Sequence, residues 1–227
     1  MISSEVNNSS YSTHRYEQQQ VYMDYLENHI NGVKNAYKKY FLPLLNEKSP
    51  LFTKAVNKAL YTRKDLYYAI RDLKDAIEHH DDSKYSDYEF EAYRQHWDPT
   101  EEEKAADQAT KDEIEERYQE AWVHHYTNND HHPMFWYDSS TNEIKDMSLP
   151  AIVHMICDWE SFTTEDRSTA DWWNSQAVEE RKFMTEKTIA TVDELIKLIH
   201  PEAFISSTPN VDKLNQYVRS EYVDNKS

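Results

Sequence analysis

Glycine is nearly absent from this chain, and that absence limits its folds more than any other feature. Gly32 is the single glycine among 227 residues, whereas proteins use glycine at about 7% of positions. Dinucleotide-binding folds, phosphate-binding loops and tight β-hairpins need glycine where φ is positive or where the backbone approaches a phosphate. The sequence therefore effectively excludes those nucleotide sites and predicts an all-α protein.

The chain is strongly acidic, with 42 acidic and 25 basic side chains and a formal net charge of −17. It repels phosphate backbones and has no cluster of lysines and arginines, so we expect no general nucleic-acid binding. The longest apolar stretches span only a few residues, far short of the roughly 20 that cross a bilayer. The N-terminus is polar and Cys157 is the single cysteine, so neither a signal peptide nor a disulfide framework is expected.

Apolar residues recur at three- and four-residue steps through much of the chain, which predicts helices. We expect a disordered tail over residues 1–14 and a single helical domain over residues 15–227. The first helix should end at Pro43, because proline interrupts the helical hydrogen bonds. A small two-stranded ribbon is predicted over 135–147. The other predicted helices cover residues 51–60, 63–80, 86–97, a segment from Asp98 to His125, 148–162, 176–199 and 211–222.

Histidines and acidic residues on the inward faces of these helices carry the chemistry. His29, His80 and His125 lie on apolar stripes, and a buried His80 followed by Asp81 offers an imidazole and a carboxylate to one divalent cation. Asp158 also falls on the apolar side of its helix, where a carboxylate needs a cation or a strong hydrogen-bond partner. The alternative is that these are ordinary core residues with satisfied hydrogen bonds.

Four short motifs, taken in order, resemble an uncharacterised family found in phage and bacterial genomes. They are HDxSK at 80–84, AWxHH at 121–125, NxHH at 129–132 and DW at 158–159. The family in turn looks like a branch of the HD-domain superfamily, whose helical bundles bind one or two divalent metals and mostly hydrolyse phosphate esters. The resemblance implies an HD-like bundle with a metal-site core over about 25–160 and C-terminal helices over 165–222.

The resemblance also implies roles for individual residues. His29, His80, Asp81 and Asp158 match the metal ligands of the HD superfamily, and the metal would be Mn, Fe, Co or Zn, with Mg as an alternative. Lys84 stands where many two-metal HD proteins have a lysine that contacts the substrate. One or two metals per chain are expected.

The middle of the predicted site departs from the HD pattern, because His125 and His132 are only seven residues apart. Two roles stay open for them. They could bind a second metal, or they could be catalytic groups that protonate the leaving oxygen or hold the phosphate. His124, His131 and Asn129 are candidate substrate-binding residues, with surface or turn positions as the alternative.

Together these features predict a metal-dependent phosphohydrolase that uses a metal-activated water on a nucleotide or another small phosphate ester. Lys84, His125 and His132 are the predicted catalytic residues, and Lys84 also binds substrate. Two alternatives stay open: an HD-type mixed-valent di-iron oxygenase, and a non-catalytic helical phage protein that binds a host partner. We expect the protein in the cytoplasm of a bacterium or a phage-infected cell. The sequence is compatible with a monomer and with an oligomer.

Overall fold

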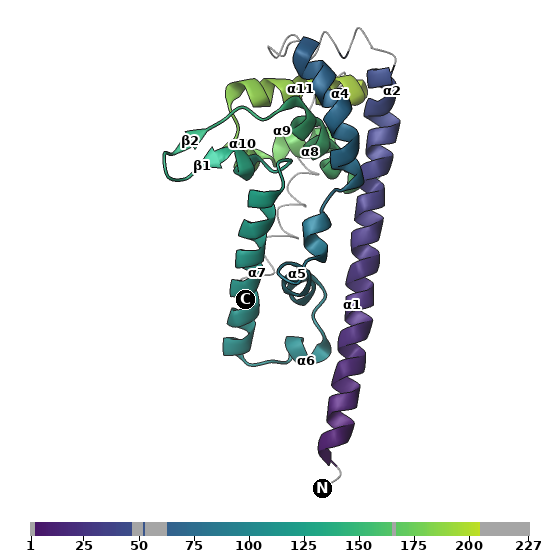
Figure 1. Ribbon diagram of the computed structural model, residues 1–227, viewed down its shortest axis with the longest axis vertical. Helices are drawn as coiled ribbons and strands as arrows, with labels where there is room; N and C mark the ends of the chain where they lie inside the picture. The colour runs from purple at the N-terminus through teal and green to yellow at the C-terminus, as the bar shows by residue number, and fades with distance from the viewer. Residues whose placement is uncertain (1–2, 47–51, 53–62, 165–166, 205–227) are drawn as a thin grey trace.

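The computed structural model describes residues 3–46, 52, 63–164 and 167–204 (Figure 1). These residues are mainly helical with one two-stranded antiparallel ribbon, which confirms the prediction of an all-α protein with a small β-ribbon. The helix predicted over 51–60, apart from Phe52, and the helix predicted over 211–222 lie outside the described residues. No helix within the described ranges is long and apolar enough to cross a membrane.

The longest element is helix α1, Ser3–Ala36, which runs along the whole molecule in Figure 1. The described backbone is helical from Ser3, so α1 includes most of the segment 1–14, for which the sequence analysis expected a disordered tail. Neither proline nor glycine occurs between Ser3 and Asn31, and nothing in the backbone therefore interrupts the helix. The polar composition that suggested disorder lowers helix propensity without preventing the helix.

The helical path also continues past Pro43, where the sequence analysis ended it. A π-helical turn, η1 (Tyr37–Phe41), follows α1 and leads into helix α2 (Leu42–Asn46). In this wider turn the N–H of Leu42 donates to the carbonyl of Tyr37, five residues earlier. The changed hydrogen-bond register accommodates a residue that has no N–H to donate.

One group of helices packs against the C-terminal part of α1. Helices α4 (Arg63–Glu78) and α8 (Leu149–Ser161) contact α1, and α11 (Glu186–Ile199) packs on α8. Figure 1 places these helices together at one end of the molecule. Helix α8 is central and is buried on almost every side. Its apolar residues form the main core with side chains from the neighbouring helices, among them Val33, Leu73, Ile77, Ile152, Ile156, Trp173, Leu195 and Ile196.

A second group lies beside an earlier part of α1. Helices α5 (Phe90–Trp97) and α7 (Gln108–Asn128) pack on each other, and α5 contacts α1. Their smaller core consists of Tyr22, Leu26, Ala92, Tyr93 and Ala121. The end of α7 and the segments after α4 and α7 run between the two groups, so polar residues from both meet there.

Several helices are shorter than predicted because capping residues start them anew. Thr100, Asp107 and Thr185 each accept a hydrogen bond from the backbone N–H three residues later, which satisfies a donor at a helix N-terminus. The segment from Asp98 to His125 is thereby divided into α6 (Glu101–Lys104) and α7, and the segment 176–199 into α10 (Val178–Arg181) and α11.

The remaining elements are short. They are η2 (Asp82–Tyr85), η3 (Pro133–Trp136), β1 (Tyr137–Asp138), β2 (Glu143–Ile144), α9 (Thr169–Ser175) and η4 (Pro201–Phe204).

The one glycine lies where α1 meets α8. A Cβ atom at Gly32 would be 2.9 Å from the Cβ of Ser161, closer than two side-chain carbons approach in a packed core. Gly32 therefore lets these two helices come together. One turn earlier on α1, His29 faces the same part of α8.

Candidate metal centre

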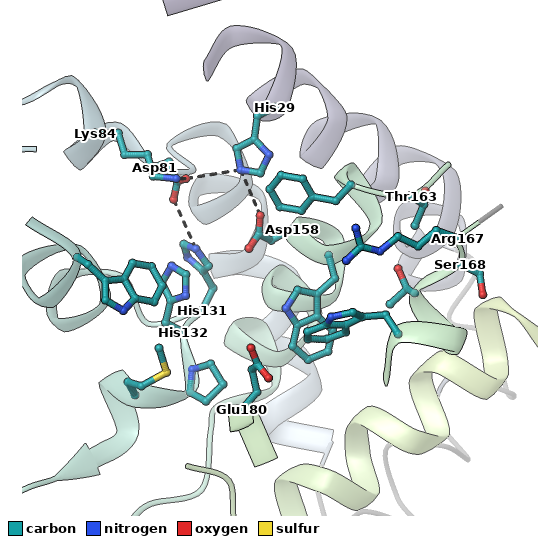
Figure 2. A pocket seen from close by; sticks show the side chains of 17 residues that line it. His29, Asp81, Lys84, His131, His132, Asp158, Thr163, Arg167, Ser168 and Glu180 are labelled. Carbon is teal, nitrogen blue, oxygen red and sulfur yellow. Dashed lines mark ion pairs between the residues drawn. The ribbon is translucent and has the colours of Figure 1, made fainter. Parts of the chain in front are cut away.

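A cluster of histidines and aspartates lies between the two groups of helices. The members come from four parts of the chain, and Figure 2 shows several of them facing one cavity. All eight are buried or nearly so. They are His29 on α1, His80 and Asp81 after α4, His125 on α7, His131 and His132 in the following loop, and His154 and Asp158 on α8.

One half of the cluster is formed by His29, His80 and Asp158. The Nε2 atom of His29 lies 3.2 Å from Oδ1 of Asp158 and 3.0 Å from Nε2 of His80. The His80 Nε2 atom is 3.6 Å from the same Asp158 oxygen. The ligand atoms of these three residues are close enough to surround one metal ion.

The other half is formed by Asp81, His125, His131 and His132, which also lie close enough to surround one ion. Oδ1 of Asp81 is 3.4 Å from Nε2 of His125 and 3.5 Å from Nε2 of His131. Its other oxygen, Oδ2, is 3.4 Å from Nε2 of His80 and 3.6 Å from Nε2 of His29. The Asp81 carboxylate therefore presents one oxygen to each half of the cluster.

The ligand atoms of this second half have no hydrogen-bond partners. Oδ1 of Asp81 and the Nε2 atoms of His125, His131 and His132 are all buried and unpaired. A buried polar atom without a partner costs about 1–3 kcal/mol, and more when the group is charged. Four such atoms converging on one point are therefore the arrangement expected of a cation site, in which a metal ion satisfies all of them.

Burial also favours the neutral form of most of these histidines. It lowers the pKa of His132 and of His154 to about 3, and it lowers the pKa of His131 and His80 as well. Neutral imidazole is the form that binds metals, since one nitrogen then carries a free lone pair. His29 differs: burial lowers its pKa, but hydrogen bonds to Asp158 and Asp81 outweigh that effect and raise the pKa to about 9.

In His29 and in His80, Nδ1 takes part in a hydrogen bond, which leaves Nε2 of each ring directed into the cluster. Ser161 Oγ donates to the carbonyl of Asp158 at 2.6 Å, which leaves it free to accept from Nδ1 of His29 at 2.9 Å. The Nδ1 atom of His80 lies 2.8 Å from Nε2 of His154. Such outer contacts fix the ring orientation of metal-binding histidines. His154 also forms a further possible ligand group with His80 and His131.

Asp81 adopts a left-handed backbone conformation, with φ of 58° and ψ of 22°. Aspartate and asparagine tolerate this region better than most residues. The conformation ends the path of α4 and turns the carboxylate inward, where Nζ of Lys84 lies 2.7 Å from Oδ2. Lys84 thus places a positive charge beside the cluster.

A cavity of about 360 Å³ opens onto the cluster. His29, Asp81, His131, His132 and Asp158 form part of its wall. Aromatic side chains form much of the rest, namely Trp122, Trp159, Phe162 and Trp172. Arg167 and Glu180 add charged groups, and Figure 2 shows Arg167 extending toward Asp158 from the opposite side of the cavity.

Comparison with known proteins identifies the family. The model of a family of unknown function, DUF5662, matches residues 18–198. The chain belongs to the DUF5662 family. The matched region includes every member of the cluster, from His29 to Asp158. No curated protein and no solved structure matches this DUF5662 chain, so its relationship to the HD superfamily stays a prediction.

The residues predicted from the DUF5662 sequence fall into two sets. The four predicted metal ligands His29, His80, Asp81 and Asp158 meet in the cluster. His125 lies there too, and Lys84, His131 and His132 line the cavity. His124 and Asn129, predicted to bind substrate, are not among the residues that line this cavity.

Sequence reasoning missed His154 and Arg167. His154 precedes Asp158 by four residues on the same helix, a spacing that puts both side chains on one face and could have drawn attention to it. Arg167 lies in the segment between α8 and α9, where no periodic pattern indicates whether a side chain points inward or outward.

Proposed function

We propose that this DUF5662 protein is a metal-dependent phosphohydrolase related to the HD superfamily, acting on a nucleotide or another small phosphate ester. The observation that carries the proposal is the set of four unpaired ligand atoms formed by Oδ1 of Asp81 and the Nε2 atoms of His125, His131 and His132. They adjoin a second ligand group and open onto a cavity. Two neighbouring cations beside a ligand-sized cavity suit the hydrolysis of a phosphate ester.

The residues divide into two ligand sets that share Asp81. His29, His80 and Asp158 would hold one cation with Oδ2 of Asp81, while His125, His131 and His132 would hold the other with Oδ1. A set this rich in imidazole favours Mn, Fe, Co or Zn over Mg. When bound, such cations polarise a phosphate oxygen and lower the pKa of a coordinated water.

The remaining charged and aromatic groups would bind the substrate. Lys84 and Arg167 face the cavity from different sides and can each contact a phosphate oxygen, for which Arg has the more suitable donor geometry. Trp159, Phe162 and Trp172 offer flat apolar surfaces for a ring. The cavity volume lies at the small end of the range for ligand sites, about 300–1,000 Å³.

This cavity is suited to a small phosphorylated compound and not to a polynucleotide. The protein has a formal net charge of −17, which opposes binding of a long phosphate backbone. The positive charge of the bound cations and of Lys84 acts locally, whereas distant carboxylates are screened beyond a Debye length of about 8 Å. We place this activity in the cytoplasm of a bacterium or a phage-infected cell.

The direct test is a hydrolysis screen with purified, metal-free protein reloaded with Mn²⁺, Co²⁺ or Mg²⁺. Nucleoside mono-, di- and triphosphates and small sugar phosphates would be the substrates, with released phosphate as the readout. We expect turnover that depends on the added metal and is absent in the Asp81→Asn variant. Stoichiometric metal binding without hydrolysis of any of these compounds would contradict the proposal.

The same ligand arrangement supports one other activity, oxidation by an HD-type mixed-valent di-iron oxygenase. The observation that favours it is the high number of histidines around a carboxylate that faces both ligand sets, with Lys84 three residues after it. Loading with iron followed by measurement of oxygen consumption separates the two activities. Iron-specific, oxygen-dependent turnover would favour the oxygenase, and metal binding without either reaction would favour a non-catalytic phage protein.

A further inference from the structure

A further buried acidic residue, Glu89, lies just outside the ligand cluster. It belongs to the segment between η2 and α5, and its side chain is fully buried. One carboxylate oxygen, Oε2, is 2.9 Å from Nδ1 of His125 and 3.0 Å from Oγ of Ser83. The other, Oε1, is 2.6 Å from Nδ1 of His124. Glu89 does not line the cavity.

The hydrogen bonds around Glu89 have a defined direction. An ionised carboxylate can only accept, so Ser83, His124 and His125 are the donors. The contact of 2.9 Å from Oε2 of Glu89 goes to Nδ1 of His125 and not to Nε2. His125 therefore carries its proton on Nδ1.

The position of this proton decides what His125 offers at its other nitrogen. A neutral ring with a proton on Nδ1 has a lone pair on Nε2. That Nε2 atom is the one that lies 3.4 Å from Oδ1 of Asp81 without a hydrogen-bond partner. Glu89 thus turns His125 so that its lone pair points into the second ligand set.

We propose that Glu89 is the positioning residue of the second cation site, holding His125 in the orientation and tautomer that bind the ion through Nε2. The inference rests on the proposed function insofar as it assumes that a cation occupies this set. Its geometry stands independently, since the contacts of Glu89 are made by the protein alone. Carboxylates that accept from metal-binding histidines play this part generally.

The proposal also accounts for motif residues that the cavity does not use. Nδ2 of Asn129 donates to Oγ of Ser83 at 2.9 Å and to the carbonyl of His125 at 2.8 Å. Ser83 in turn donates to Glu89. These side chains therefore form one hydrogen-bonded layer behind His125, in which Asn129 supports the ring and does not contact substrate.

The first experiment compares two substitutions of similar size. In Glu89→Gln the amide oxygen can still accept from Nδ1 of His125, while the amide NH₂ turns to His124. Glu89→Met fills the same space but accepts nothing. We expect Glu89→Met to weaken binding of the second equivalent of Mn²⁺ or Co²⁺ by about 10- to 100-fold and Glu89→Gln to retain most of that affinity, measured by calorimetric titration.

The matched control is His124→Ala, which removes a half-exposed partner of Glu89 and leaves the contact with His125 intact. It should bind two equivalents as the wild type does. The first equivalent should be unaffected in all three variants. Equal affinity of the Met and Gln variants for the second equivalent would overturn the proposal, because simple packing does not distinguish an acceptor from a thioether.

The second experiment needs no metal. Nitrogen-15 NMR of the histidine rings in the metal-free protein at pH 8 reports which nitrogen of His125 carries the proton. We expect Nδ1–H in the wild type and in Glu89→Gln, and a change in Glu89→Met. Protonation of Nε2 alone in the wild type would overturn the proposal. If instead the tautomer is as expected but no metal binds, the proposed function fails and the role of Glu89 in orienting His125 stands.

Discussion

Two buried polar clusters in this protein differ in whether their charges are satisfied. Around Arg94, the guanidinium donates to both oxygens of Glu103, at 3.0 Å and 2.6 Å. The Thr100 N–H donates to Glu103 as well, at 2.7 Å. Only Nε of Arg94 lacks a hydrogen-bond partner in this cluster.

The histidine–aspartate cluster is the opposite case. Four of its ligand atoms have no partner although they are as deeply buried. The Arg94 cluster stabilises α5 and α6 by itself, because donors and acceptors are matched within the protein. The histidine cluster has an excess of acceptors, and the difference indicates that a bound cation is part of its folded, functional state.

The largest effect on cation binding is expected from Asp81→Asn, because Asp81 faces both ligand sets. Asparagine tolerates the left-handed backbone conformation of this position, so the fold should be retained while the charge is lost. We expect the variant to lose both cations and all hydrolysis, measured by metal analysis and turnover. Asp82→Asn is the control, since Asp82 is exposed and contacts His79; equal loss in both variants would mean that Asp81 is not a ligand.

A smaller effect, the loss of one cation, is expected when a residue of one ligand set alone is removed. His131→Ala or His132→Ala should lose the second cation and lower turnover at least about tenfold, while the first cation remains. His29→Ala should lose the first cation and retain the second. The measurement is metal stoichiometry after dialysis, and loss of both cations in His131→Ala would show that the two sets are not separable.

No loss of cations is expected from Arg167→Ala, which changes the substrate side of the cavity. A hydrogen bond to a charged group contributes about 1.5–3 kcal/mol, so KM should rise about 10- to 100-fold. Steady-state kinetics with the best substrate of the screen test this. Arg167→Lys should recover part of the affinity, and an unchanged KM in both variants would place the phosphate elsewhere.

Substitution in the Arg94 cluster should also leave cation binding unchanged and should alter only the stability of the fold. Burial raises the pKa of Glu103, but hydrogen bonds from Arg94, Gln95 and Thr100 outweigh it and lower the pKa to about 2. Because the folded-state pKa is lowered, this stabilisation is present above pH 4.5 and is lost as the pH falls toward 2. Glu103→Gln should lower the free energy of unfolding by about 1.5–3 kcal/mol at pH 7 and flatten its pH dependence in that window.

The control for the Glu103→Gln prediction is the increase in melting temperature that added cation causes. Added cation should raise the melting temperature of Glu103→Gln as much as that of the wild type. A smaller increase in the variant would show that the two polar clusters are coupled.

The sequence predicted part of this centre because some ligands lie on amphipathic helices. His29 and His80 stand on apolar stripes, Asp158 falls on the apolar side of its helix, and Asp81 directly follows His80. His154 was missed because it lies outside the four motifs, although it precedes Asp158 by four residues on the same helix. The loop position of His131 gives no periodicity from which its burial could be predicted.

The fold was likewise predicted only in part from the sequence. The helices followed from the three- and four-residue periodicity of apolar residues, whereas their boundaries depended on local hydrogen bonds. The capping residues Thr100 and Asp107 divide one predicted helix, and the π-helical turn before Pro43 allows another to continue. Glu89 contacts His124 and His125 on α7, and Arg167 shares the cavity with residues far from it in the sequence, which a single sequence does not reveal.

The most direct test of the central claim is a crystal structure of the protein grown with Mn²⁺ or Co²⁺, with anomalous scattering recorded at the metal edge. We predict two anomalous peaks per chain, one on each side of the Asp81 carboxylate, with histidine nitrogens at about 2.0–2.2 Å as in other transition-metal sites. An ordered structure without an anomalous peak beside Asp81 would contradict the account.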